Sequence, residues 1–243
     1  MKMMKLGLLL LCHCIVYTSF AQVAQHSGWF ASFNTIKLSD KWGIHAELQI
    51  RSTDDWQQVQ SILPRIGLNY QVAKNQVLTA GCAYIPNRVT VGSNSGLLGE
   101  HRIWQQYLIN QPVGKITVAH RFRLEERFTP KGILDGGEVK VSERVYSTRF
   151  RYFIRAIIPF TKQRPFVKGA FIALQNEAFV NITDKQNVNG RFFDQNRAYV
   201  AFGYRFSKKM DIEAGYMNQY VQRTKAQANV ANHIAQLATY LRL

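Results

Sequence analysis

The stretch from Gly99 to Phe128 constrains the fold most, because apolar and polar side chains alternate along it. In its second half, one face carries Ile116, Val118, His120, Phe122, Leu124 and Phe128, and the other carries Thr117, Ala119, Arg121, Arg123, Glu125 and Arg127. Alternation with a period of two residues predicts a β-strand, and the short link at 111–114 predicts a hairpin. A charged face opposite a broad aromatic one is typical of a membrane barrel with lipid outside and a polar lumen.

The same alternation recurs along the chain and predicts an all-β, antiparallel transmembrane barrel of 10–12 strands. Single-chain bacterial barrels have even numbers of strands, whereas eleven segments alternate here. Either residues 28–37 enter the lumen, or one strand is unrecognised and the barrel has twelve. The segments are 28–37, 42–51, 59–71, 76–86, 99–110, 115–128, 144–160, 165–182, 192–206, 210–222 and 230–243.

The connections between these segments alternate in length, which predicts short periplasmic turns and longer outer loops. The longer ones include 86–98 and 129–143, and the second has Asp135-Gly136-Gly137 at its tip. Aromatic residues at the strand ends are expected to form interfacial girdles. The short turns are expected at 38–41, 72–75, 111–114, 161–164 and 207–209, and the longer loops at 52–58, 86–98, 129–143, 183–191 and 222–229.

The N-terminus has the pattern of a cleaved export signal, namely a basic start, an apolar run over 6–16 and small residues before a cleavage point. Cleavage after Ala21 would leave residues 22–243 as a single barrel domain and lower the formal net charge from +16 to +14, because Lys2 and Lys5 are lost. The alternative is an N-terminal membrane anchor, but the run is shorter than the roughly 20 residues that a spanning helix needs. We expect the protein in the outer membrane.

The sequence predicts no cofactor, no metal site and no catalytic set. The pair Cys12 and Cys14 lies within the expected signal, and Cys82, the one remaining cysteine, is expected to face lipid or the core. His45 alone among the histidines shares a face with clearly inward residues, and no Ser–His–acid set has plausible spacing. The segment 135–138 predicts a turn rather than a calcium loop, because further oxygen ligands are missing.

The inward faces of the predicted strands carry arginines and glutamates, and these are the candidate functional residues. Arginine pairs bidentately with carboxylates, so one hypothesis is a lumen plugged by ion pairs, and the other is a lumen whose surplus arginines attract small anions. The basic residues recur singly on alternate strand positions, which argues against nucleic-acid binding. The candidates are Glu47, Arg51, Arg65, Glu100, Arg102, Arg121, Arg123, Glu125, Arg127, Arg149, Arg151, Arg155, Glu177, Arg197, Arg205 and Glu213.

Six segments spread over most of the chain resemble the family called domain of unknown function 2490. They are Glu100–Gln106, His120–Phe128, Arg149–Tyr152, Asn176–Glu177, Phe193–Arg197 and Gly215–Gln219. The resemblance implies an exported outer-membrane barrel, and it implies no activity, substrate or catalytic residue.

The function expected from the sequence is therefore an outer-membrane barrel, either structural or a narrow, porin-like barrel that prefers anions. Its expected partners are outer-membrane lipid and small anions, without nucleic acid. Two alternatives stay open at this point: an outer-membrane enzyme that acts on lipid, and a soluble periplasmic β-protein.

Overall fold

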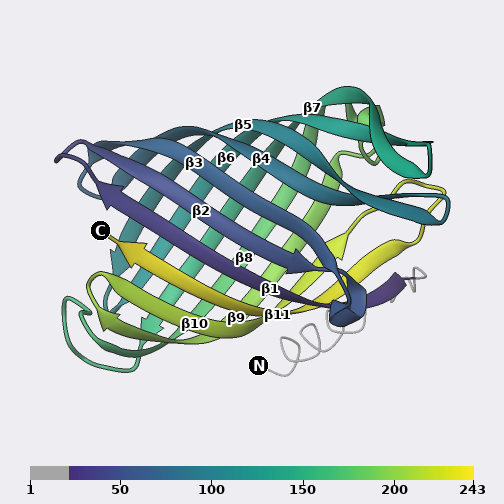
Figure 1. Cartoon of the computed structure of the whole chain (residues 1–243). Helices are drawn as coiled ribbons and strands as arrows, with labels where there is room; N and C mark the ends of the chain where they lie inside the picture. The colour runs from purple at the N-terminus through teal and green to yellow at the C-terminus, as the bar shows by residue number, and fades with distance from the viewer. Residues whose placement is uncertain (1–21) are drawn as a thin grey trace, which may run out of the picture.

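The computed structural model describes residues 22–243 and folds them into a closed barrel of eleven β-strands (Figure 1). The predicted all-β barrel is confirmed. Consecutive strands are antiparallel neighbours throughout. The strands are β1 (Gln22–Lys37), β2 (Trp42–Ser52), β3 (Val59–Ala73), β4 (Gln76–Val91), β5 (Asn94–Val113), β6 (Ile116–Asp135), β7 (Glu138–Pro159), β8 (Gly169–Thr183), β9 (Phe193–Ser207), β10 (Met210–Val221) and β11 (Asn229–Arg242).

The barrel closes where β1 pairs with β11 in parallel, from Gln22 opposite Asn229 to Thr35 opposite Arg242. Both sequence hypotheses for residues 28–37 are therefore wrong: the segment lies in the wall, and the barrel has neither ten nor twelve strands. Parallel closure lets an odd number of strands form a barrel without a free edge. It also places the start of β1 and the end of β11 at opposite ends of the barrel. We call the end with the start of β1 and the β4–β5 and β6–β7 turns the hairpin end. The other end, where β11 ends, is the C-terminal end.

Two predicted loops are wrong, because the strands on either side continue through them. Strands β4 and β5 extend to Val91 and Asn94, and β6 and β7 extend to Asp135 and Glu138, so each pair is joined by only two residues. In these extensions glycine, polar and apolar residues are mixed on both faces, so the alternation that marks a strand in sequence is lost. The predicted short turn at 161–164 is also wrong, since residues 160–168 separate β7 from β8.

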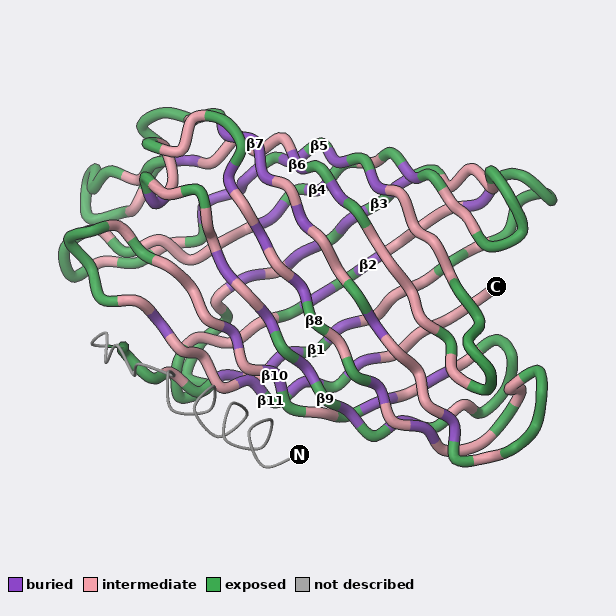
Figure 2. The backbone as a smooth tube through the Cα atoms, turned by 180° about the vertical axis from the view of Figure 1, so that it is seen from behind, coloured by how far each residue is buried: buried purple, intermediate pink, exposed green. Residues whose placement is uncertain are grey.

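Buried and exposed residues alternate along the strands, as Figure 2 shows. Every strand exposes at least one large apolar side chain on the outer surface, and Cys82 is exposed there too. One example from each strand, in order, is Phe30, Leu48, Ile66, Leu78, Ile103, Leu124, Ile154, Leu174, Phe202, Tyr216 and Leu237.

The interior has an apolar wall and a charged wall. The apolar wall is a cluster on β8–β11 and β1, formed by Trp29, Phe171, Ala173, Tyr199, Ala201, Met217 and Ile234. Most of the buried arginines and glutamates lie on β2–β7. The two walls face one lumen, so its character changes around the barrel.

The expected signal at 1–21 lies outside the described residues. Over 22–243, the helical elements are two single-turn 3-10 segments, η1 (Asp54–Trp56) and η2 (Lys185–Asn187), and no helix has the length and apolar character to cross a membrane.

Candidate functional site

Glu125 is the centre of the charged wall. Its side chain projects from β6 into the lumen with 0% exposure. One carboxylate oxygen accepts from Arg149 at 2.7 Å, and the other accepts from Arg151 at 2.5 Å. Arg102 lies 3.8 Å away on the neighbouring strand. Three cations from β5 and β7 therefore surround one buried carboxylate, and such a charge is stable only while it stays paired.

Glu100 forms a second centre nearer the hairpin end. Arg102 donates to both of its carboxylate oxygens, at 2.7 and 2.9 Å, and Arg127 donates at 2.8 Å. Arg102 reaches toward both Glu100 and Glu125, so the two centres form one network. We call the five residues Glu100, Arg102, Arg127, Glu125 and Arg149 the ion-pair barrier.

Further ion pairs join more of the predicted lumen residues. Glu177 accepts from Arg121 and from Arg151, both at 2.7 Å. The remaining pairs are Arg65 with Glu47, Arg155 with Glu213 at 2.5 Å, and Arg205 with Asp211 at 2.8 Å. Thirteen of the sixteen candidates thus form carboxylate–arginine hydrogen bonds, which leaves Arg51, Arg123 and Arg197.

These three arginines interact with amides and aromatic rings instead. Arg51 donates to Gln49 and lies 3.9 Å from the Trp29 ring centre. Arg123 donates twice to the Gln106 side chain, at 3.0 and 2.7 Å, and lies 4.6 Å from the Trp104 ring. A cation over an aromatic face is stabilised by the ring quadrupole, so the rings partly replace a carboxylate.

Two glycines make room for the ring beneath Arg123. Gly67, Gly81 and Trp104 are successive cross-strand partners on β3, β4 and β5. A Cβ atom on Gly81 would lie 2.7 Å from the Trp104 ring and 2.2 Å from the Ile66 carbonyl oxygen, and one on Gly67 would lie 2.8 Å from the ring. Only the absence of side chains there lets the indole, with 0% exposure, lie flat against the wall.

A cavity of about 740 Å³ occupies the lumen on the C-terminal side of the barrier. Lys209, Arg242 and Leu243 line it where the chain ends, and Trp29, Arg151 and Arg197 line it deeper in the barrel. Nine basic residues line this cavity against two acidic ones, Glu47 and Glu177. The basic residues are Lys37, Arg65, Arg121, Arg123, Arg151, Arg155, Arg197, Lys209 and Arg242.

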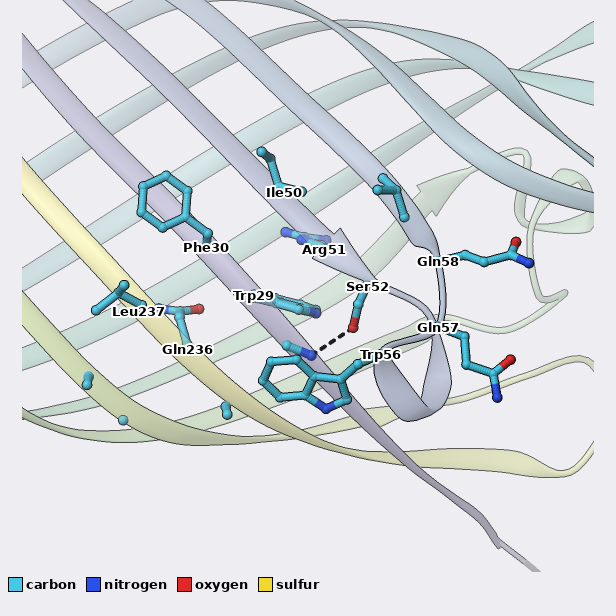
Figure 3. A pocket seen from close by; sticks show the side chains of 15 residues that line it. Trp29, Phe30, Ile50, Arg51, Ser52, Trp56, Gln57, Gln58, Gln236 and Leu237 are labelled. Atoms are coloured by element: carbon cyan, nitrogen blue, oxygen red, sulfur yellow. Dashed lines mark hydrogen bonds between the residues drawn. The ribbon is translucent and has the colours of Figure 1, made fainter.

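A second pocket of about 640 Å³ lies at the β1–β11 closure (Figure 3). Phe30, Ile50 and Leu237 line it. Trp56 lies across Gly28, where a Cβ atom would be 2.3 Å from the indole, and the Gly28 amide donates to Ser52 at 2.8 Å. The charged residue in its lining is Arg51, which already donates to Gln49, and the rest of the lining is apolar or uncharged.

The structure describes one group with metal-ligand spacing over 22–243, namely His26, Asp54 and Asp55. All three are exposed, and the Asp54 carboxylate accepts from the backbone amides of His26 and Asp55. The group is thus explained as a loop cap. His45 lies 3.5 Å from Glu47 within the lumen, as a member of the charged wall.

Sequence reasoning missed several residues that complete the site. Asp194 accepts from Arg149 at 2.8 Å, and Asp211 accepts from both Arg205 and Arg242. Asp211 alternates in phase with Glu213, so the period-two pattern contained a signal for it. Trp104 also alternates in phase with Arg102, but a large aromatic residue in a barrel strand is expected outside, so its place in the lumen was not predicted.

A family model described as "Protein of unknown function (DUF2490)" matches residues 26–230. No curated protein matches the chain. Among solved structures, the NanC porin in a rhombohedral crystal form is similar with a TM-score of 0.48 and 10% identity, over 84% of this chain and 92% of that chain.

Proposed function

The chain belongs to the DUF2490 family of unknown function, and we propose that it is an outer-membrane β-barrel whose lumen attracts anions. One observation supports the anion preference above all others, namely the excess of basic over acidic residues around the cavity. A low-dielectric wall strengthens the field of these charges and raises the local concentration of anions.

The outer surface supports a membrane location. Soluble proteins rarely expose a contiguous apolar patch of more than a few hundred Å², whereas here apolar side chains are exposed on all eleven strands. Closure also satisfies the backbone hydrogen bonds within the wall, as a span through lipid requires. Cell fractionation tests this location: recovery in detergent with heat-modifiable gel mobility is expected, and a soluble protein after osmotic shock would contradict it.

We expect the hairpin end outside the cell, because outer-membrane barrels carry their longer extensions there. Ser93 lies at that end and Asp40 at the other. In a Cys82→Ala background, Ser93→Cys should react with a membrane-impermeant maleimide on intact cells, and Asp40→Cys should react only after lysis. With parallel closure, the start of β1 and the end of β11 should be reached from opposite sides. Equal labelling of both cysteines on intact cells would contradict the topology.

The anion preference is tested in planar bilayers under a potassium chloride gradient. A small conductance whose reversal potential lies toward that of chloride is expected. The triple variant Arg121→Gln, Arg155→Gln and Lys209→Gln, which removes three cations from the cavity lining, should move the potential toward zero. The matched control is a triple substitution of exposed lysines outside the cavity, Lys131→Gln, Lys140→Gln and Lys162→Gln, which should leave the potential unchanged. Cation preference in the wild-type protein would refute the proposal.

The ion-pair barrier favours a second candidate function, a closed structural barrel. Glu100, Glu125 and their arginines project into the lumen on the hairpin side of the cavity, and most of these residues are less than a tenth exposed. A closed barrel predicts no conductance in the wild-type protein, while anions still enter the cavity from the C-terminal end. Bilayer recordings therefore separate the two candidates.

A further inference from the structure

Two deeply buried arginines of the cavity lining have no carboxylate within hydrogen-bonding distance in the described part of the chain. Arg123 is 1% exposed; its Nη1 makes no hydrogen bond, and its nearest carboxylate, that of Glu125, is 4.0 Å away. Arg197 is 7% exposed; its Nη2 donates to Gln195 at 3.3 Å, and its Nε makes no hydrogen bond. Both side chains line the cavity.

A buried cation without a counter-ion is unstable, and the local compensation is incomplete. Arg197 lies between Trp29 and Phe179, with its guanidinium 5.0 and 4.7 Å from the two ring centres, and Arg123 stacks on Trp104. The rings cover the guanidinium faces but accept no N–H hydrogen bond along the edges. Arg123 Nη1 and Arg197 Nε are therefore left as donors that no protein group within 22–243 accepts.

The two arginines flank Arg151. Arg123 and Arg151 are direct cross-strand partners, and Arg197 and Arg151 stack on the same Phe179 ring. Arg151 is itself satisfied by Glu125 and Glu177. Like charges directly opposite each other on two strands destabilise a sheet, so this row of three cations accumulates positive charge at the deep end of the cavity, where one further anion would relieve it.

The rest of the cavity lining is partly apolar, so it does not suit an anion that carries charge on every side. Apolar and aromatic side chains alternate with the cations in the lining, and Phe33 stacks on Tyr240 at 5.0 Å. At about 740 Å³, the volume lies within the range of sites for small organic ligands. The apolar and aromatic residues are Trp29, Phe33, Val77, Leu108, Ala119, Phe153, Ile157, Met217, Tyr240 and Leu243.

We propose that Arg123 and Arg197 bind the acidic head of an organic anion, a carboxylate, sulfonate or phosphate, whose apolar body lies along the aromatic side of the cavity. The inference rests on the anion-attracting lumen of the proposed function and adds the class of ligand. Arginine suits the head group because its planar fork donates two parallel hydrogen bonds to such oxygens.

Calorimetric titration of the mature barrel, purified from membranes in a neutral detergent, tests the class of ligand. The probes are 2-naphthoate, the uncharged 2-naphthamide and inorganic phosphate, each also titrated into detergent alone. Naphthoate should bind at least about tenfold more tightly than naphthamide, as expected for hydrogen bonds to a charged group, and more tightly than phosphate. Equal affinity for naphthoate and naphthamide, or for naphthoate and phosphate, would overturn the proposal.

Substitutions test the two residues. Arg123→Gln and Arg197→Gln should each weaken naphthoate binding about tenfold, and the control Lys162→Gln, an exposed loop residue with the same charge change, should leave it unchanged. If a variant fails to fold, the wild-type protein still decides, since naphthoate should raise its unfolding temperature and naphthamide should not. Anion-directed reversal potentials without naphthoate binding would refute this site alone; absence of both would refute the proposed function as well.

Discussion

The ion-pair barrier on β5–β7 and the cavity beside it use the same residue type in two different ways. Arg127 and Arg149 in the barrier donate to carboxylates, whereas Arg123 and Arg197 in the cavity donate only to amides and lie on aromatic rings. The difference lies in which arginines a carboxylate reaches. All three barrier arginines donate to Glu100 or Glu125, whereas no carboxylate of the described chain lies within hydrogen-bonding distance of Arg123 or Arg197.

This contrast shows that the number of arginines in a lumen does not decide whether it is closed. A paired arginine is held between strands and fills space. Arg123 and Arg197 are also covered by rings, but each keeps a buried N–H donor that no protein group among the described residues accepts. What distinguishes the two regions is therefore that every arginine of the barrier has a carboxylate partner, whereas Arg123 and Arg197 of the cavity have none within hydrogen-bonding distance over residues 22–243.

The largest expected effect is on the barrier. Glu125→Gln removes the charge that balances Arg149, Arg151 and Arg102, and with 0% exposure no water screens what remains. Breaking a buried ion pair by removing one partner costs about 3–5 kcal/mol. The free energy of unfolding, measured by urea titration in detergent, should fall by that amount.

Glu126→Gln is the matched control, since it makes the same substitution one residue further along β6 on the opposite face. Its carboxylate accepts from Gln105 at 3.5 Å and forms no ion pair with the described residues, so the stability should change by no more than about 1 kcal/mol. Equal effects of the two variants would show that Glu125 is not a buried member of an ion-pair network.

A smaller effect on stability is expected to distinguish Arg149 of the barrier from Arg197 of the cavity. Arg149→Gln takes donors from both Glu125 and Asp194 and should cost about 1.5–3 kcal/mol, the value of hydrogen bonds to charged groups. Arg197→Gln breaks no carboxylate contact and relieves a buried positive charge, so it should change stability by less than about 1 kcal/mol. Urea titration of both variants measures the difference. A loss for Arg197→Gln as large as that for Arg149→Gln would mean that the cavity is ion-paired like the barrier.

The barrel itself could be predicted because its signal is local. Period-two alternation survives wherever one face meets the apolar outside and the other the lumen, as along 116–128. The same logic explains the errors at 86–98 and 129–143: once strands rise above the apolar band, both faces meet water and alternation disappears. The parallel pairing of β1 with β11 joins segments about 200 residues apart and leaves no local pattern.

The candidate site could be predicted only as a set of residues. Alternation identified which side chains point inward, but which arginine meets which glutamate depends on the register across several strands. Arg123 and Glu125 are two residues apart on one face, yet Glu125 bonds to Arg149 and Arg151 of the next strand. No single segment shows that Arg123 lacks a carboxylate partner in the described chain or that Trp104 lies beneath it. The position of Trp104 follows from the pairing of β3, β4 and β5.

The smallest expected effect is at the C-terminal end, where the cavity meets water. Asp40 lies in the turn between β1 and β2, fully exposed, and accepts from Lys37 of the cavity lining at 2.7 Å. That hydrogen bond and the nearby positive charge hold the pKa of Asp40 below its usual value.

Asp40→Asn makes the same acid-to-amide change as Glu125→Gln, but water screens the lost charge, so the urea midpoint should not move. Freed from its partner, Lys37 should shift the reversal potential slightly further toward anions at low salt, and the shift should vanish at about 1 M salt, where the screening length is about 3 Å. A clear fall in the urea midpoint would show that this end is as dry as the barrier, and the contrast between the two halves would then be wrong.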